Sequence, residues 1–157
     1  MNDAQAEERV IALLSRCQGR ARHLRFDVSC KSVDEAALAV SGSARDFVKN
    51  IFMVDASGRA VLAIVGGEDR ASVSRTARIL DCPALRLAEA GEMVALSGFP
   101  PGGMPSFGFD ARYVLDDRLH EPWRMVYTGG GSVRSLVHIC IADLLALNEA
   151  RIARIRR

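Results

Sequence analysis

The sequence has almost no lysine, because Lys31 and Lys49 are the only lysines among its 21 basic residues. It also has no apolar run near the ~20 residues that a membrane-spanning helix needs. Its acidic first residues lack the basic and then apolar order of a signal peptide, so we expect a cytoplasmic protein with no membrane partner. The 157 residues, 49% hydrophobic with a net charge of +2, predict one globular domain over 1–157 and do not by themselves indicate a nucleic-acid partner.

Several common site motifs are also missing. The four cysteines stand singly without CxxC spacing, and the three histidines have no partner at metal-ligand spacing, so we predict neither a disulfide framework nor a metal site. No GxxxxGK[ST], GxGxxG or GxSxG pattern occurs, which argues against phosphate-loop, dinucleotide-binding and nucleophile-elbow enzymes. We therefore expect no cofactor.

The most unusual segment that is present runs from Gly98 to Gly108 and contains four glycines and three prolines. Glycine reaches backbone angles that other residues avoid and lets a ligand approach the main chain, while proline fixes the segments in between. This composition predicts a binding loop whose N–H groups point at an acceptor.

Lys49 lies in the apolar run 47–54, which is typical of a core strand with its preceding turn. A lysine that leaves water there requires an anionic or carbonyl partner. Alternatively, its stem extends along the strand entrance and keeps the amino group in solvent. The residues alone leave both interpretations open.

Hydrophobic periodicity predicts an α+β domain, with a mixed β-sheet core flanked by helices, rather than a doubly wound parallel sheet. Ser32 and Glu35 form the expected capping box of one helix, and residues 56–59 form the expected turn of a β-hairpin. The arginine-rich end, 151–157, fits a nucleic-acid contact or a solvated helix terminus equally well. The expected helices cover 4–16, 32–40, 71–80, 90–96 and 142–150, and the expected strands cover 24–28, 50–55, 60–65, 85–88, 112–115, 125–127 and 133–141.

Five features, in matching order and spacing, resemble the YbaK-like and prolyl-tRNA-synthetase-associated editing domains, which hydrolyse wrongly charged aminoacyl-tRNA. The resemblance covers most of the chain and implies the same mixed-sheet fold. The features are a lysine that begins a core strand (Lys49), a glycine–acid break (66–69), a Gly-aromatic-x-x-Gly-Gly-x-Pro-x-x-Gly loop (98–108), a strand ending in Asp116, and a late glycine cluster (129–131).

The resemblance implies that Lys49 is needed for activity and positions the 3′ end of the tRNA or the ester. It also implies that water is the nucleophile and that backbone N–H groups hold the ester carbonyl as it becomes an oxyanion. The pocket residues that it implies are Gly98, Phe99, Gly102, Gly103, Pro105, Ser106, Phe107, Gly108, Asp116, Gly129 and Gly130.

Two positions depart from the family pattern, and both bear on amino-acid specificity. The family loop often has proline where this chain has Ser106, and many relatives have Ser-Gly-Gly where this chain has Gly129–Ser132. We expect a free-standing trans-editing deacylase of tRNA(Pro) carrying alanine or cysteine, with prolyl-tRNA synthetase as a further partner. Two alternatives stay open: a non-catalytic module of the same fold that binds tRNA or a synthetase, and a small-molecule pocket unrelated to tRNA.

Overall fold

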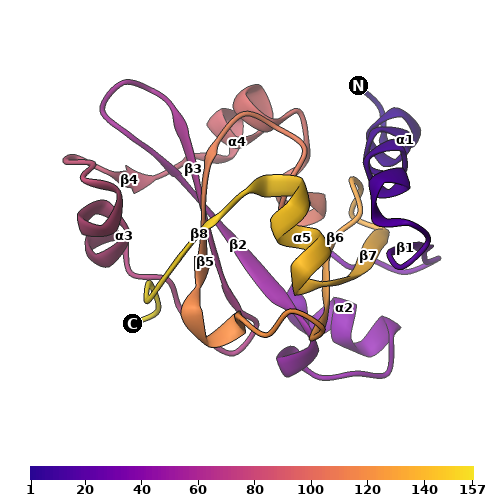
Figure 1. The fold of residues 1–157 in the computed structure, drawn as a ribbon. Coiled ribbons are helices and arrows are strands. Elements are labelled where there is room, and N and C mark those ends of the chain that lie inside the picture. Colours follow the sequence, from indigo (N-terminus) through magenta and orange to yellow (C-terminus); the bar gives the residue numbers. More distant parts are fainter.

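The computed structural model describes residues 1–157 and contains two β-sheets with five α-helices packed around them (Figure 1). The larger sheet is mixed, because β2 runs antiparallel to β3 and β4, whereas β5 runs parallel to β3 and β8. The predicted α+β class with a mixed sheet is therefore confirmed. The strand order in this sheet is β4 (Arg86–Leu87), β2 (Val48–Val54), β3 (Ala60–Gly66), β5 (Arg112–Asp116) and β8 (Arg151–Ala153).

The smaller sheet has three antiparallel strands in the order β1 (Arg22–Arg25), β7 (Ser135–Cys140) and β6 (Met125–Gly129). An isolated bridge between Phe47 and Tyr127 joins the start of β2 to β6, and the two rings stack with their centroids 5.0 Å apart. The sequence did not indicate that the strands divide into two sheets. Their junction is where the candidate site forms.

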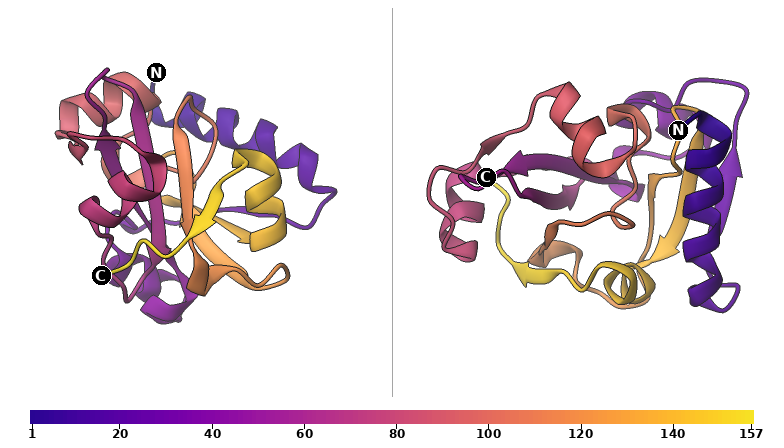
Figure 2. Two further views of the ribbon diagram at one scale, coloured as in Figure 1. Left: turned by 60° about the vertical axis from the view of Figure 1, so that its left-hand side comes forward. Right: turned by 90° about the horizontal axis from the view of Figure 1, so that it is seen from above.

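The helices lie on the outside of the two sheets. α1 covers the smaller sheet, and α3 lies at the opposite end of the molecule against the larger sheet (Figures 1 and 2). None of the helices is both long enough and apolar enough to cross a membrane. The helices are α1 (Asp3–Leu14), α2 (Val33–Ala39), α3 (Val73–Leu80), α4 (Ala90–Ser97) and α5 (Ile141–Asn148), with short 3-10 turns at Ser15–Cys17, Ala44–Asp46, Pro101–Gly103 and Asp117–Leu119.

β3 is the centre of the larger sheet, and every one of its residues is buried. Because side chains alternate along a strand, Leu62 and Ile64 pack into one core together with Val10 of α1. Val61 packs into a second core together with Leu80 of α3. Burial on both faces explains why β3 is a continuous apolar run in the sequence.

Two local predictions can be compared with the structure directly. The β2–β3 hairpin is confirmed, and Gly58 adopts a φ of +83° in its turn. Ser32 caps α2 as predicted, because its Oγ accepts the backbone N–H of Glu35 at 3.1 Å. The predicted reciprocal hydrogen bond, from the Ser32 backbone N–H to the Glu35 carboxylate, is wrong. That carboxylate accepts a hydrogen bond from Ser29 Oγ at 2.8 Å instead.

The predicted boundaries fail mainly where long-range pairing decides the structure. The first strand lies at Arg22–Arg25 rather than at 24–28, because its partners in β7 fix its register. The last helix ends at Asn148, where Glu149 takes a φ of +53°. The C-terminal residues therefore do not prolong a helix, and Arg151–Ala153 add a parallel strand beside β5.

Candidate active site

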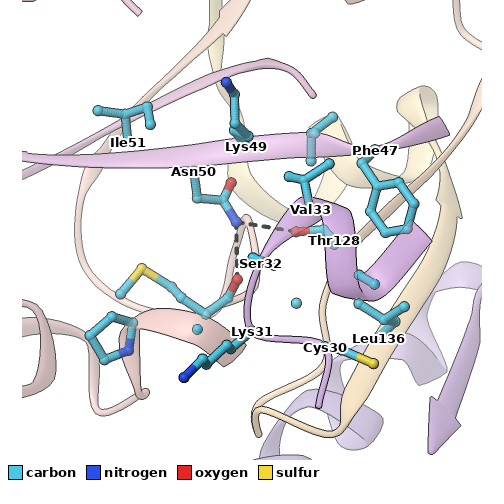
Figure 3. A pocket seen from close by; sticks show the side chains of 16 residues that line it. Cys30, Lys31, Ser32, Val33, Phe47, Lys49, Asn50, Ile51, Thr128 and Leu136 are labelled. Carbon is cyan, nitrogen blue, oxygen red and sulfur yellow. Dashed lines mark hydrogen bonds between the residues drawn. The ribbon is translucent and has the colours of Figure 1, made fainter. Parts of the chain in front are cut away.

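A cavity of about 280 Å³ lies where β2, the segment before α2, the glycine- and proline-rich loop and β6 meet (Figure 3). Three of the predicted site residues line it, namely Lys49, Gly102 and Gly129. Val33 and Leu136 supply apolar walls, and no aspartate or glutamate contributes to the lining. The cavity therefore combines apolar side chains, main-chain segments and positive charge.

Lys49 is the second residue of β2 and pairs with Val65 of β3. Because successive side chains leave a strand in opposite directions, Lys49 extends from one side of β2 and Asn50 from the other (Figure 3). Lys49 is half-buried, and none of the seven ion pairs of the chain includes it. Its charge is thus not neutralised by a carboxylate of this protein.

Asn50 is the hydrogen-bonding centre of the cavity floor. Its Nδ2 donates to the carbonyl oxygen of Met104 at 3.0 Å and to Thr128 Oγ1 at 3.2 Å, while its Oδ1 accepts from Ser106 Oγ at 2.6 Å. Ser106 Oγ also lies 2.8 Å from Thr128 Oγ1. Polar groups buried in this way need partners, and these bonds join β2, the loop and β6 into one unit.

Sequence reasoning missed Asn50 and Thr128. A signal for Asn50 was present, because it is an amide inside an apolar strand and directly follows Lys49. Ser106 is fully buried and bonds only to Asn50 and Thr128 through its hydroxyl. With no histidine among its partners, Ser106 is not arranged as the nucleophile of a Ser-His-Asp triad.

The two glycine segments, 98–108 and 129–131, pack main chain against main chain. A Cβ added to Gly103 would lie 2.5 Å from the carbonyl carbon of Ser132, and one added to Gly129 would lie 2.5 Å from that of Met104. The N–H of Gly131 donates to the carbonyl oxygen of Gly103 at 2.8 Å. Any side chain at these glycines would push the segments apart.

Some backbone N–H groups of the two glycine segments donate hydrogen bonds within the protein and are therefore not available to an oxyanion. Gly103 donates to the carbonyl oxygen of Pro100 at 3.0 Å, and Gly130 donates to that of Ser135 at 3.1 Å. Gly102 and Gly129, by contrast, belong to the cavity lining. The lining thus favours these two positions for close approach of a ligand to the main chain.

Other residues of the predicted loop lie outside the cavity lining. Phe99 and Phe107 are fully buried and belong to the large core rather than to the cavity lining. Gly98 ends α4 with a φ of +78°, and Gly108 takes a φ of +93°. Their conformations require glycine. Pro105 is also buried and lies outside the lining.

Asp116 is fully buried at the end of β5 and is also outside the cavity lining. Its Oδ1 accepts the backbone N–H groups of Ile155 at 3.0 Å and Arg156 at 3.1 Å. Its Oδ2 lies 3.0 Å from Arg156 Nη1. The carboxylate therefore holds the C-terminal segment against β5.

Cys30 is the one thiol in the lining. Burial is the main cause that raises its pKa, and the nearby Glu35 carboxylate raises it further. The thiol is the form favoured at neutral pH, and a thiol is a weak nucleophile compared with a thiolate. Cys30 is thus an apolar wall of the cavity rather than an attacking group.

Comparison with known protein families matches residues 27–147 to the aminoacyl-tRNA editing domain. The chain belongs to the aminoacyl-tRNA editing domain family. The relationship that the sequence features predicted is thus confirmed. The matched part of this editing domain contains the whole cavity lining, from Cys30 to Leu136.

Comparison with individual relatives supports the same family assignment. This editing domain is 25% identical over 103 residues to the proline–tRNA ligase of Lactobacillus delbrueckii subsp. bulgaricus, a match that covers 65% of this chain but only 18% of the ligase. A solved structure described as a candidate trans-editing enzyme for prolyl tRNA synthetase matches 97% of both chains at 31% identity, with a TM-score of 0.84. A hypothetical protein of known structure matches 95% of this chain and 99% of its own at 26% identity, with a TM-score of 0.85.

α1 lies outside the matched region of the editing domain, yet it supports the second glycine segment. The Glu7 carboxylate accepts from Ser132 Oγ at 2.6 Å and pairs with Arg25. Burial would raise the pKa of Glu7, but the hydrogen bonds from Ser132 and Arg25 together hold it below its usual value. Glu7 is therefore charged at neutral pH and fixes the turn that follows Gly131.

Proposed function

We propose that this editing domain is a free-standing, trans-editing deacylase that hydrolyses the ester of misacylated tRNA(Pro), removing alanine or cysteine. The end-to-end match to a candidate trans-editing enzyme supports this proposal, as does the partial match to a proline–tRNA ligase. The observation that carries it is a single cavity lined by Lys49, Gly102 and Gly129 and by no carboxylate. An association with prolyl-tRNA synthetase is part of the same proposal.

In the proposed reaction, water adds to the ester carbonyl, whose oxygen becomes an oxyanion. The bond between the carbonyl carbon and the ribose oxygen then breaks, which releases the free amino acid and restores the ribose hydroxyl. A positive charge with no carboxylate partner stabilises such developing negative charge. Lys49 supplies that charge to the oxyanion or to the adjacent RNA, and a ribose hydroxyl of the substrate together with main-chain groups positions the water.

The apolar wall of the cavity suits the side chain of a small aminoacyl group such as alanine or cysteine. The cavity volume of about 280 Å³ is bounded on the apolar side by Val33, Ala36 and Leu136. An apolar pocket separates amino acids that differ by one methylene by only ~1–3 kcal/mol. A synthetase therefore gains fidelity from a second, hydrolytic site, and the role of this cavity is to admit the small wrong residue.

The test is a deacylation assay with tRNA(Pro) charged with alanine, cysteine, serine or proline. Lys49→Ala should fold normally and lose at least about 100-fold in rate, as expected for removal of a group that stabilises an oxyanion. Arg78→Ala is the matched control, because Arg78 is an exposed cation on α3 at the other end of the molecule. Circular dichroism of each variant verifies the fold.

The remaining outcomes of this assay separate the alternatives. Release of one mischarged amino acid that depends on Lys49 supports the proposal and names the substrate. Binding of tRNA without release would instead support the non-catalytic module. If the protein neither binds tRNA nor releases an amino acid, the proposal fails and the cavity serves a different small molecule.

A further inference from the structure

Both lysines of the chain line the same cavity. Lys31 lies just before Ser32, the N-cap of α2, while Lys49 lies in β2. No arginine contributes to the lining, although arginine supplies every other basic residue of the protein. The two amino groups extend from opposite sides of the cavity (Figure 3).

Neither lysine is neutralised by the protein. The cavity lining contains no aspartate or glutamate, and neither lysine takes part in any of the ion pairs of the chain. Two uncompensated positive charges at one cavity favour an anionic ligand over a neutral one. An ammonium group on a flexible stem suits a phosphate, which it contacts as a compact point charge.

The backbone of Lys31 is held at the cavity rim by the glycine-rich loop. A Cβ added to Gly102 would lie 2.5 Å from Lys31 Cβ and 3.1 Å from Lys31 Cα. Lys31 itself is exposed. The main chain is thus fixed by close packing, while the amino group stays in solvent within reach of a ligand that extends out of the cavity.

We propose that Lys31 is a phosphate contact of this site and binds a phosphodiester of the single-stranded 3′ end of the tRNA. This inference rests on the proposed function. The aminoacyl ester occupies the cavity, and the RNA strand that carries it leaves past Lys31, on the side opposite Lys49. Lys31 binds and orients the strand and takes no part in the chemical step.

The test measures binding of an uncharged minihelix that carries the single-stranded 3′ end of tRNA(Pro), by fluorescence anisotropy over a series of salt concentrations. Lys31→Met should raise Kd about tenfold, because it removes a charge-assisted hydrogen bond. It should also reduce the slope of log K against log salt by about 0.7, the value for one phosphate contact on a single strand. Lys31→Arg should restore both quantities to within about twofold, since it keeps the charge.

Arg78→Met is the control for loss of a positive charge elsewhere on the surface. If Lys31→Met and Arg78→Met give the same Kd and the same salt slope as each other, the inference about Lys31 is overturned. Deacylation provides a second readout, in which Lys31→Met should raise KM much more than it changes kcat. A loss confined to kcat would also overturn the inference.

Failure of the proposed function gives a different result. If the unmodified protein binds the minihelix with a slope that depends on Lys31 but releases no amino acid, the phosphate contact holds and the deacylase proposal fails. If it hydrolyses the ester while Lys31→Met behaves like Arg78→Met, the deacylase proposal holds and the Lys31 contact fails. If it binds no RNA at low salt, both fail.

Discussion

Asn50 Nδ2 donates a hydrogen bond to the carbonyl oxygen of Met104 at 3.0 Å, and this bond ties β2 to the glycine- and proline-rich loop. The strand that carries Lys49 and the loop that carries Gly102 are thereby fixed relative to each other. Since the same amide also contacts Thr128, β6 is held in the same arrangement. The geometry of the cavity thus depends on one half-buried, uncharged side chain.

Replacing Asn50 tests this dependence. Asn50→Ala removes the donor to the Met104 carbonyl oxygen and one hydrogen-bond acceptor of the Ser106 hydroxyl. It should lower the free energy of unfolding by about 1–3 kcal/mol, the cost of leaving buried polar groups unpaired. Urea titration monitored by circular dichroism measures the change. A loss below about 0.5 kcal/mol, typical of an unremarkable surface site, would show that the network does not stabilise the floor.

Gly129 should not tolerate any side chain. In Gly129→Ala the new Cβ would lie 2.5 Å from the carbonyl carbon of Met104, so the segments must separate at a cost of at least about 2 kcal/mol. Gly91→Ala is the matched control, because a Cβ there meets nothing within 4 Å, and it should raise stability by about 0.4–1 kcal/mol. Thermal melts compare the two variants, and equal midpoints would contradict the close packing.

Asp116 should matter for stability rather than for catalysis. Asp116→Ala removes the acceptor of the Ile155 and Arg156 backbone N–H groups, while Arg156 keeps its ion pair with Asp117 at 2.6 Å. It should cost about 2–3 kcal/mol, as for loss of hydrogen bonds to a charged acceptor. At a temperature where the variant is fully folded, its kcat/KM for the mischarged tRNA should equal that of the unmodified protein. A tenfold fall in kcat/KM under those conditions would place Asp116 in the reaction instead.

The sequence was most informative where local patterns decide the structure. Apolar runs separated by Gly58 predicted the β2–β3 hairpin, and the pattern around Lys49 and the two glycine segments predicted the family. Long-range contacts were not predictable in this way. The short strand Arg151–Ala153 exists only because β5 offers a parallel edge, and its arginines gave no local sign of it.

In the candidate site, too, local patterns were predictable and long-range contacts were not. The rarity of lysine marks Lys49 in the sequence, whereas no local pattern links Lys31 to it. Phe99 and Phe107 belong to a loop that resembles a pocket segment. Their rings lie in the core because the hydrophobic effect favours burial of apolar side chains. Which side of a loop faces a cavity depends on tertiary packing, and the order of residues does not reveal it.

The interlocked main chains at Gly103, Gly129 and Gly131 also limit how this domain can diverge. A side chain at Gly103 or Gly129 would meet the main chain of the other glycine segment, and one at Gly131 would meet the main chain of α1 at Ala6. If the proposed function holds, a change of the amino acid that is removed is therefore expected to proceed through side chains on the cavity wall. Val33, Ala36 and Leu136 are the positions where paralogues with new substrates should differ first.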